Sequence, residues 1–247
     1  MISTEVIVYT VLVYLLAGSI KGAVGIGLPM AAIGISSQFT DPRMAISLVV
    51  FPVLFSNTWQ VFREGKIIQT FKSCWLYALT MMIVLVAMTF VTARIDTNAL
   101  LFVLGLVIFT FAVTGLWVSP PALPDRFDSI AQFLGGSLSG VLGGLTAIWA
   151  PPIVIYLMAK RVDKDAFVRI TGVLLFLGSI SLCIGFWQAG LLTGSSTLFS
   201  IGLVVPTLLG FSIGEILRRR LNSQRFRTLV LLFFLVMGLN LIRRSII

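Results

Sequence analysis

Long apolar runs follow one another along almost the whole chain, and they constrain the fold more than any other feature. Hydrophobic residues fill 58% of the 247 positions and charged residues only 11%. A soluble domain of this size would carry about 25% charged residues to cover its surface. Apolar runs of about 20 residues are typical of membrane-spanning helices. The sequence therefore predicts an all-α polytopic membrane protein with no soluble domain.

About eight hydrophobic segments can be placed between loop signals. They cover residues 6–35, 42–62, 71–93, 99–118, 129–159, 166–188, 196–217 and 226–242. The second opens at Asp41 and Pro42, an N-cap residue followed by a proline, which is typical of a helix start. Residues 120–128 hold three prolines and three charged side chains. We interpret this stretch as the linker between two four-segment repeats, residues 1–119 and 129–247.

The first segment of each repeat contains glycines that a plain membrane helix does not need. Adding 118 to the residue number carries Gly18 to Gly136, Ser19 to Ser137, Gly22 to Gly140, and Gly25 to Gly143. Gly27 and Pro29 extend the first pattern. Gly144, Pro151 and Pro152 extend the second. We therefore expect both segments to be discontinuous, the second one at Gly143-Gly144 and at the prolines.

Length and charge indicate whether these two segments cross the membrane or return. A 30-residue helix would be roughly 45 Å long, too long for a ~30 Å apolar core, whereas two half-helices of about 14 residues would suit a re-entrant hairpin. The chain has 18 Lys and Arg residues, of which Lys21 is embedded. The other 17 divide as 13 and 4 between the two sides if both segments return, and as 11 and 6 if both cross.

The more uneven division fits the positive-inside rule better, so it favours re-entrant segments over crossing ones. Each repeat then has three true spans, and an odd number of spans inverts the second repeat relative to the first. In either arrangement the strongly basic side, with Arg218, Arg219 and Arg220, is expected to be cytoplasmic.

The two interrupted segments are suited to binding an anion. Non-helical backbone survives inside lipid only where protein or a water-filled cavity supplies partners for its N–H and C=O groups. A helix that starts after a break directs free N–H groups and a partial positive charge inward. Two such breaks that face each other near the membrane midplane, with no carboxylate nearby, predict an anion site of the kind found in transporters.

Lys21 and the glycines each have a second interpretation. An ionisable residue inside a membrane segment is a functional candidate, but Lys21 could instead extend to the membrane interface. The pairs Gly18/Gly22 and Gly136/Gly140 also fit the small-xxx-small spacing of helix packing. The polar residues of the second segment, Asn57 among them, could form interhelical hydrogen bonds instead of a pathway mouth.

The candidate substrate-binding residues lie at the two breaks and in the second segment. They are Lys21, Gly22, Gly25, Gly27, Asn57, Gln60, Ser139, Gly143, Gly144 and Trp149.

Other classes of function find no support in the composition. The chain has a net charge of +9 but no basic stripe with interleaved aromatic residues. We therefore expect its Lys and Arg residues to lie in loops and to fix the orientation in the membrane, and we do not expect nucleic-acid binding. Cys74 and Cys183 lie in apolar surroundings and form neither a metal-ligand spacing nor a disulfide framework, so we expect each to be a small core residue. The chain has no His and no acid pair or nucleophile–base pair. We expect no catalytic residue, no metal and no cofactor, and only weak support for a proton relay.

The duplicated arrangement resembles the sulfite exporter TauE/SafE family of bacterial membrane permeases. The resemblance covers the whole chain. It rests on the two glycine motifs with Pro29 and Pro151, on Asn57 and Gly65 in the region of the second segment, and on Pro206, Gly210 and Gly214 in the seventh. The third segment lacks the glycines of the seventh, so the repeats are not strictly equivalent.

The resemblance implies a transporter in the bacterial inner membrane that exports sulfur-containing anions such as sulfite, sulfoacetate or other small organosulfonates. An importer, or a permease for another small anion or organosulfur compound, is the alternative. The expected partners are the small anionic substrate and the lipid bilayer. The oligomeric state stays open, a homodimer included.

Overall fold

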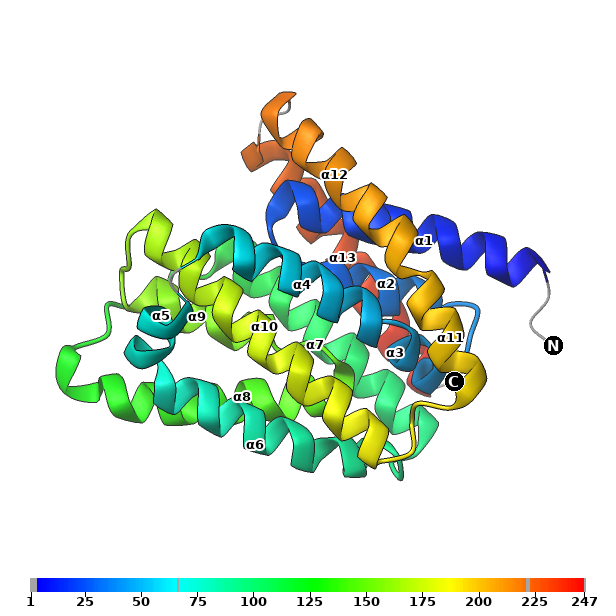
Figure 1. The fold of residues 1–247 in the computed structure, drawn as a ribbon, viewed down its shortest axis with the longest axis horizontal. Coiled ribbons are helices and arrows are strands. Elements are labelled where there is room, and N and C mark those ends of the chain that lie inside the picture. Colours follow the sequence, from blue (N-terminus) through cyan, green and yellow to red (C-terminus); the bar gives the residue numbers. More distant parts are fainter. Residues whose placement is uncertain (1–3, 66, 221–222, 247) are drawn as a thin grey trace. The chain divides into compact units, whose positions relative to one another are not determined.

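The computed structural model describes residues 4–65, 67–220 and 223–246, which form helices joined by short turns (Figure 1). The all-α prediction is confirmed for these residues. In chain order the elements are α1 (Thr4–Val24), α2 (Leu28–Ser36), α3 (Pro42–Leu48), α4 (Val50–Glu64), α5 (Ile67–Ser73), α6 (Trp75–Thr92), α7 (Thr97–Trp117), the 3-10 turn η1 (Asp125–Phe127), α8 (Asp128–Thr146), α9 (Ala150–Ala159), α10 (Lys164–Gln188), α11 (Gly194–Gly202), α12 (Val204–Arg220) and α13 (Ser223–Ile246).

Seven stretches of the described chain are long and apolar enough to cross a membrane. They are Glu5–Val24, Pro42–Arg63, Trp75–Thr92, Thr97–Trp117, Lys164–Gln188, Gly194–Arg218 and Arg225–Ile246. Each corresponds to one of the eight predicted segments. The remaining segment, residues 129–159, forms α8 and the short apolar helix α9. Glycines, serines and Gln132 interrupt the apolar residues of α8, which is not among the seven candidate spans.

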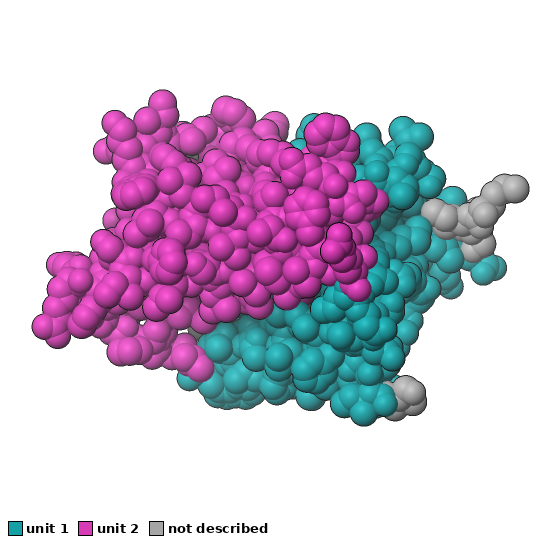
Figure 2. Space-filling view, turned by 90° about the horizontal axis from the view of Figure 1, so that it is seen from below, with its two compact units in different colours: residues 1–56, 95–117, 192–247 teal, residues 57–94, 118–191 magenta. Residues whose placement is uncertain are grey.

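Two compact units make up the fold, coloured separately in Figure 2. Unit 1 contains Met1–Ser56, Ile95–Trp117 and Leu192–Ile247, and unit 2 contains Asn57–Arg94 and Val118–Leu191. Each unit contains segments from both halves of the sequence. The boundaries of the compact units therefore differ from those of the proposed repeats. The chain passes from unit 1 to unit 2 inside α4, at the peptide bond between Ser56 and Asn57.

Unit 1 is held together by helix pairs that meet at glycines. α1 packs along α12, and α7 packs along α13. A Cβ atom added to Gly18 or Gly22 of α1 would overlap the backbone of α12, and one added to Gly210 or Gly214 would overlap the backbone of α1. The two backbones therefore touch, as helices with small residues at their interface do. The packing interpretation of Gly18 and Gly22 is confirmed.

Unit 2 uses the same device. α8 packs along α6, and Cβ atoms added to Gly136, Gly140 or Gly144 would overlap the backbone of α6. The hydroxyl of Thr92 on α6 donates a hydrogen bond of 2.7 Å to the carbonyl of Gly144. α10 lies against α6, α8 and α9 and completes the unit.

Both interrupted segments fold back on themselves. α2 packs against α1, and the ring of Phe39, just after α2, lies 6.3 Å from the ring of Tyr9 near the start of α1. α9 packs against α8, and Lys160 at the end of α9 contacts Asp128 at the start of α8, with 2.8 Å between Nζ and Oδ2. Each segment is therefore a hairpin within its own unit.

The sequence predicts two half-helices of about 14 residues in each hairpin, and this prediction is wrong. α1 has 21 residues and α2 has 9, while α8 has 19 residues and α9 has 10. The first arms are long because most of their glycines remain helical and serve the contacts with α12 and α6. The breaks follow only where these contacts end.

Asp41 begins a helix as predicted, and Asp163 begins another. The carboxylate of Asp41 accepts hydrogen bonds from the N–H groups of Arg43 and Met44, at 2.8 and 3.3 Å, with Pro42 at the start of α3. Asp163 accepts from the N–H of Ala166 at 2.8 Å. Such caps satisfy N–H groups that would otherwise lack partners. Of the basic run expected to be cytoplasmic, the side chains of Arg219 and Arg220 lie outside the described residues.

The glycine contact between α1 and α12 can be tested with one substitution at two positions. In Gly18→Val the new side chain would collide with the backbone carbonyl of Thr207, so we expect the free energy of unfolding to fall by about 1–3 kcal/mol, the usual cost of overpacking. Gly202→Val is the control, since a Cβ at Gly202 meets nothing within 4 Å. Equal thermal midpoints for the two variants in detergent would contradict the contact.

Candidate functional site

The first break covers residues 25–27, within the stretch from Gly18 to Pro29 that the sequence predicts to be interrupted. Gly25 and Gly27 have φ angles of 89° and 103°, a left-handed region that glycine enters readily and other residues rarely do. The N–H of Gly25 donates to the carbonyl of Lys21 at 2.6 Å, which completes the last turn of α1. Gly27 is the N-cap residue of α2. The two glycines thus let the chain leave one helix and begin the next within three residues.

The start of α2 offers backbone donors. In its first three positions, Leu28 and Met30 carry an N–H group and Pro29 carries none. The N–H groups of a first helical turn have no partner within the helix, and they coincide with its partial positive charge. Ile20 and Phe234 border the break, each 3.5 Å from a Cβ built on Gly27. The break therefore presents donors beside apolar side chains.

Lys21 lies one turn before this break and is directed into unit 1. Its side chain is only 2% exposed, and Nζ donates a hydrogen bond of 2.9 Å to the hydroxyl oxygen of Ser56 on α4. The Ser56 hydroxyl in turn donates to the carbonyl of Val53 at 3.1 Å, which leaves its oxygen free to accept from the ammonium. A lysine that extended to the surface of the unit would not be buried in this way. Lys21 thus places a buried amino group beside Ser56 of α4, from the turn of α1 that precedes the break.

The second break covers residues 147–149, and its predicted position at Gly143-Gly144 is wrong. Gly143 and Gly144 remain helical in α8 and pack against Leu85 of α6. Ala147 makes the turn with a φ of 55°, although a Cβ makes this conformation costly. Glycine is used here for the close approach of α8 to α6, not for the turn. The proline prediction is confirmed, because α9 opens with Ala150, Pro151 and Pro152.

The start of α9 offers fewer backbone donors than the start of α2. Pro151 and Pro152 lack an N–H group, so Ala150 alone carries one in the first three positions. Trp149 is the N-cap residue, and its carbonyl accepts a hydrogen bond of 3.0 Å from the hydroxyl of Ser139. Its indole Nε1 is buried and has no hydrogen-bond partner in the described part of the chain. This N–H, which lies against Gly178 of α10, is, among the described residues, an unpaired side-chain donor at the second break.

The Trp149 ring fits against α10 at a glycine. A Cβ on Gly178 would overlap the indole ring, so only glycine admits the ring at this position. Gly143 faces the Cβ of Trp149 from α8. Ser139, Gly143 and Trp149 are thus brought together in unit 2, as their selection from the sequence implies for a common site.

Asn57 and Gln60 lie on the face of α4 that meets α10. The side-chain amide of Asn57 donates to the carbonyl of Leu175 at 3.0 Å, so the interhelical interpretation describes this contact. Gln60 lies beside Gly172. Its Oε1 and the Oγ1 of Thr171 are buried, and neither has a hydrogen-bond partner among the described residues. Buried polar atoms are nearly always paired, so these atoms are candidates to contact a ligand.

The candidates therefore divide between the units. Lys21, Gly25 and Gly27 are at the break of unit 1, whereas Gly22 serves the contact with α12. In unit 2, Gly144 serves the contact with α6. The others of unit 2 lie at the break or on the face of α4 that meets α10: Asn57, Gln60, Ser139, Gly143 and Trp149.

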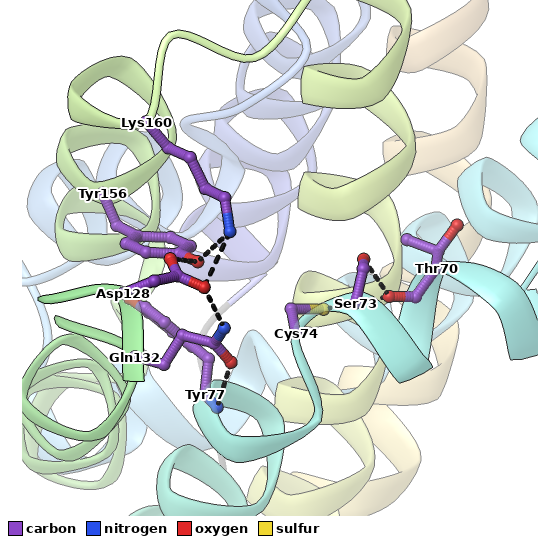
Figure 3. A network of polar contacts seen from close by, with 8 residues as sticks. All are labelled: Thr70, Ser73, Cys74, Tyr77, Asp128, Gln132, Tyr156 and Lys160. Carbon is purple, nitrogen blue, oxygen red and sulfur yellow. Dashed lines mark hydrogen bonds and ion pairs between the residues drawn. The ribbon is translucent and has the colours of Figure 1, made fainter. Parts of the chain in front are cut away.

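A polar network closes the open end of the second hairpin (Figure 3). The carboxylate of Asp128 accepts hydrogen bonds from Lys160 and Gln132, both at 2.8 Å, and from the hydroxyl of Tyr156 at 2.9 Å. Partial burial alone would raise the pKa of Asp128, but these donors outweigh it and lower the pKa. The linker joins the same end, because the N–H of Leu123 donates to the carbonyl of Ala159 at 2.8 Å.

Sequence reasoning did not find Tyr77 or Gly178. Tyr77 of α6 is fully buried, and its hydroxyl lies 2.7 Å from the hydroxyl oxygen of Ser139. In a sequence, a tyrosine near the end of an apolar run reads as a membrane-interface residue. Gly178 shows no local pattern that would pair it with Trp149. Only the tertiary contacts of unit 2 reveal these two residues.

A comparison with known protein families matches most of the chain. The profile of a protein family described as "Sulfite exporter TauE/SafE" matches residues 10–241, which include both breaks. Neither a curated protein nor a solved structure matches the chain.

The Asp128 network predicts a pH dependence of stability. A carboxyl whose pKa is lowered by folding stabilises the fold above its unfolded pKa, about 3.9 for Asp, and this contribution is lost as the pH falls through the lower, folded value. We therefore expect the wild type to exceed Asp128→Asn in thermal midpoint at pH 6, and the difference to shrink below pH 4. Asp165→Asn, at an exposed position on α10, is the control. A constant difference between pH 6 and pH 3 would contradict the assignment.

Proposed function

Since the chain belongs to the sulfite exporter TauE/SafE family, we propose that it exports a small sulfur-containing anion, such as sulfite, sulfoacetate or another organosulfonate. It is a multi-pass membrane transporter and not an enzyme. The observation that carries the proposal is the buried lysine of α1, one turn before a helix break. We place the protein in a bacterial inner membrane, with the end of α12 that carries Arg218 facing the cytoplasm. In this orientation its charges would follow the positive-inside rule.

The proposed role of unit 1 is to supply charge. The Lys21 ammonium would attract a sulfite or sulfonate group and would share it with the N–H groups of Leu28 and Met30. A hydrogen bond between a charged donor and an anion is stronger than a neutral one, and low polarity around it strengthens it further. Ser56 accepts from Lys21 in the structure. In this proposal it holds the ammonium in place for the anion.

Unit 2, taken by itself, offers an anion neutral hydrogen-bonding groups. The indole N–H of Trp149 and the hydroxyl of Thr171 are donors, and the amide of Gln60 offers both donors and an acceptor. Their partnerless atoms are buried in the described structure, which supports a role for them in contacting substrate. Asn57 would support α4 against α10 at the same face.

We also propose that the two halves of the sequence are inverted repeats. Their counterparts pair in matching ways: α1 packs on α12, and α8 packs on α6. Gly18 and Gly22 contact α12, while Gly136 and Gly140, 118 residues later, contact α6. The return of α9 to the start of α8 favours re-entrant segments. Such repeats would allow alternating access by movement of one part of the fold against another.

The role of Lys21 can be tested by thermal shift of the purified protein with sulfite, sulfate, thiosulfate and two-carbon sulfonates. A ligand at 100 times its Kd stabilises a protein by about 2.7 kcal/mol, which is readily measured. We expect Lys21→Met to weaken binding about tenfold or more, as loss of a charged hydrogen bond does. Lys72→Met, at an exposed position on α5, is the control. Unchanged affinity in Lys21→Met would remove this residue from the site.

The direction of transport can be tested in vesicles that contain only this chain. A negative interior favours outward movement of an anion by about 2.3 kcal/mol per charge per 100 mV. We expect efflux of labelled sulfite to accelerate when a potassium gradient with valinomycin makes the interior negative, and to slow when the potential is reversed. Flux that does not respond to the potential would contradict uncoupled anion export and would favour coupling to another ion.

A further inference from the structure

Tyr77 of α6 occupies a fixed position beside the second hairpin. Its side chain has no solvent exposure, and a Cβ on Gly135 of α8 would collide with its ring. A Cβ on Gly136 would overlap the Tyr77 carbonyl. The two adjacent glycines thus make room for the ring and the backbone of this one residue.

The direction of the hydrogen bonds between Tyr77 and the break follows from their chemistry. A carbonyl oxygen can only accept, so the single proton of the Ser139 hydroxyl goes to the carbonyl of Trp149, at 3.0 Å. The contact of 2.7 Å between the hydroxyls of Tyr77 and Ser139 therefore uses the proton of Tyr77. The chain runs in one direction, from the hydroxyl of Tyr77 through Ser139 to the carbonyl of Trp149.

This chain ends at the residue that begins α9. The carbonyl of Trp149, the N-cap residue, accepts a hydrogen bond from Ser139, so this bond holds the start of α9. The same residue carries the buried indole N–H that has no partner among the described residues. The orientation of that donor depends on how firmly the backbone of Trp149 is held.

At its other end, Tyr77 is tied to the open end of the hairpin. Its backbone N–H lies 3.4 Å from Oε1 of Gln132, whose Nε2 donates to Asp128 at 2.8 Å. Figure 3 shows these residues side by side with Tyr156 and Lys160. Asp128 and Gln132 are one turn apart on α8, and Ser139 lies two further turns along. A single residue of α6 thus joins both ends of the hairpin.

We propose that Tyr77 is a positioning residue of the transporter: through Ser139 it holds the backbone of Trp149, so that the indole N–H meets the transported anion in a fixed orientation. The proposal rests on the proposed function of the second break. It adds a residue of α6, outside the hairpin itself, whose hydroxyl controls affinity without touching the anion.

Two measurements on the purified full chain test this proposal: amide hydrogen exchange at residues 147–149 without ligand, and the Kd for sulfite. Loss of one hydrogen bond corresponds to about a threefold to tenfold change in an equilibrium. We expect Tyr77→Phe to accelerate exchange at the break and to weaken sulfite binding, each by about that factor. Ser139→Ala should do the same or more, because it removes the bond to Trp149 itself.

Matched controls separate this role from a general loss of stability. Ser137→Ala removes a hydroxyl of α8 that bonds only within its own helix, to the carbonyl of Phe133. Tyr9→Phe removes a hydroxyl from an exposed tyrosine. Neither should change exchange at the break or sulfite affinity. Added to Trp149→Phe, Tyr77→Phe should weaken sulfite binding no further, because its effect passes through the indole.

The outcomes distinguish this proposal from the proposed function. Unchanged exchange in both Tyr77→Phe and Ser139→Ala overturns the positioning role. Faster exchange with unchanged sulfite affinity, while Trp149→Phe does weaken binding, also overturns it. If sulfite does not bind the wild type, or Trp149→Phe binds it equally well, the proposed function of the second break fails instead. The exchange data then still decide whether Tyr77 holds the break.

Discussion

Direct contact between helix backbones at glycines is the interaction on which the rest of the structure depends. Lipid is as apolar as a leucine side chain, so helices in a membrane gain little from hydrophobic burial and associate through close packing. α1 packs along α12, and α8 packs along α6, at glycines whose missing side chains let the two backbones touch. These contacts hold the long first arm of each hairpin. Because α1 and α8 are held by their partner helices, each hairpin keeps its position although its backbone is not helical at the break that follows.

Each break then requires partners for its backbone, and the two units meet this requirement differently. In unit 1 two glycines in left-handed conformations complete the turn, and α2 begins with N–H groups on Leu28 and Met30. In unit 2 an alanine makes the turn, and prolines remove most of the donors that α9 would present. A side chain supplies a partner for the backbone at this break, because the hydroxyl of Ser139 donates a hydrogen bond to the carbonyl of Trp149.

The helical segments, the Asp41 cap and the interruption of the first segment can be predicted from the sequence, because they depend on residues close together in the chain. Gly25 and Gly27 are needed for a local turn, and Asp41 caps the helix it precedes. The second break was misplaced because a glycine that turns the chain and one that admits a neighbouring helix look alike in a sequence. Gly143 and Gly144 are of the second kind. Partners such as Tyr77 could not be predicted, since they depend on which helices become neighbours.

The two hairpins are alike in packing and different in chemistry, and one pair of positions makes this plain. Lys21 and Ser139 are 118 residues apart, so they are counterparts in the proposed repeat. Both are buried. The amino group of Lys21 donates to Ser56 of α4 in unit 1, whereas Ser139 uses its only proton on the backbone of unit 2. Two hairpins that pack alike can therefore differ in the groups that they offer to a ligand. In our proposal, the hairpin of unit 1 acts on the anion through the charge of Lys21, and the hairpin of unit 2 acts through the neutral indole N–H held by Ser139.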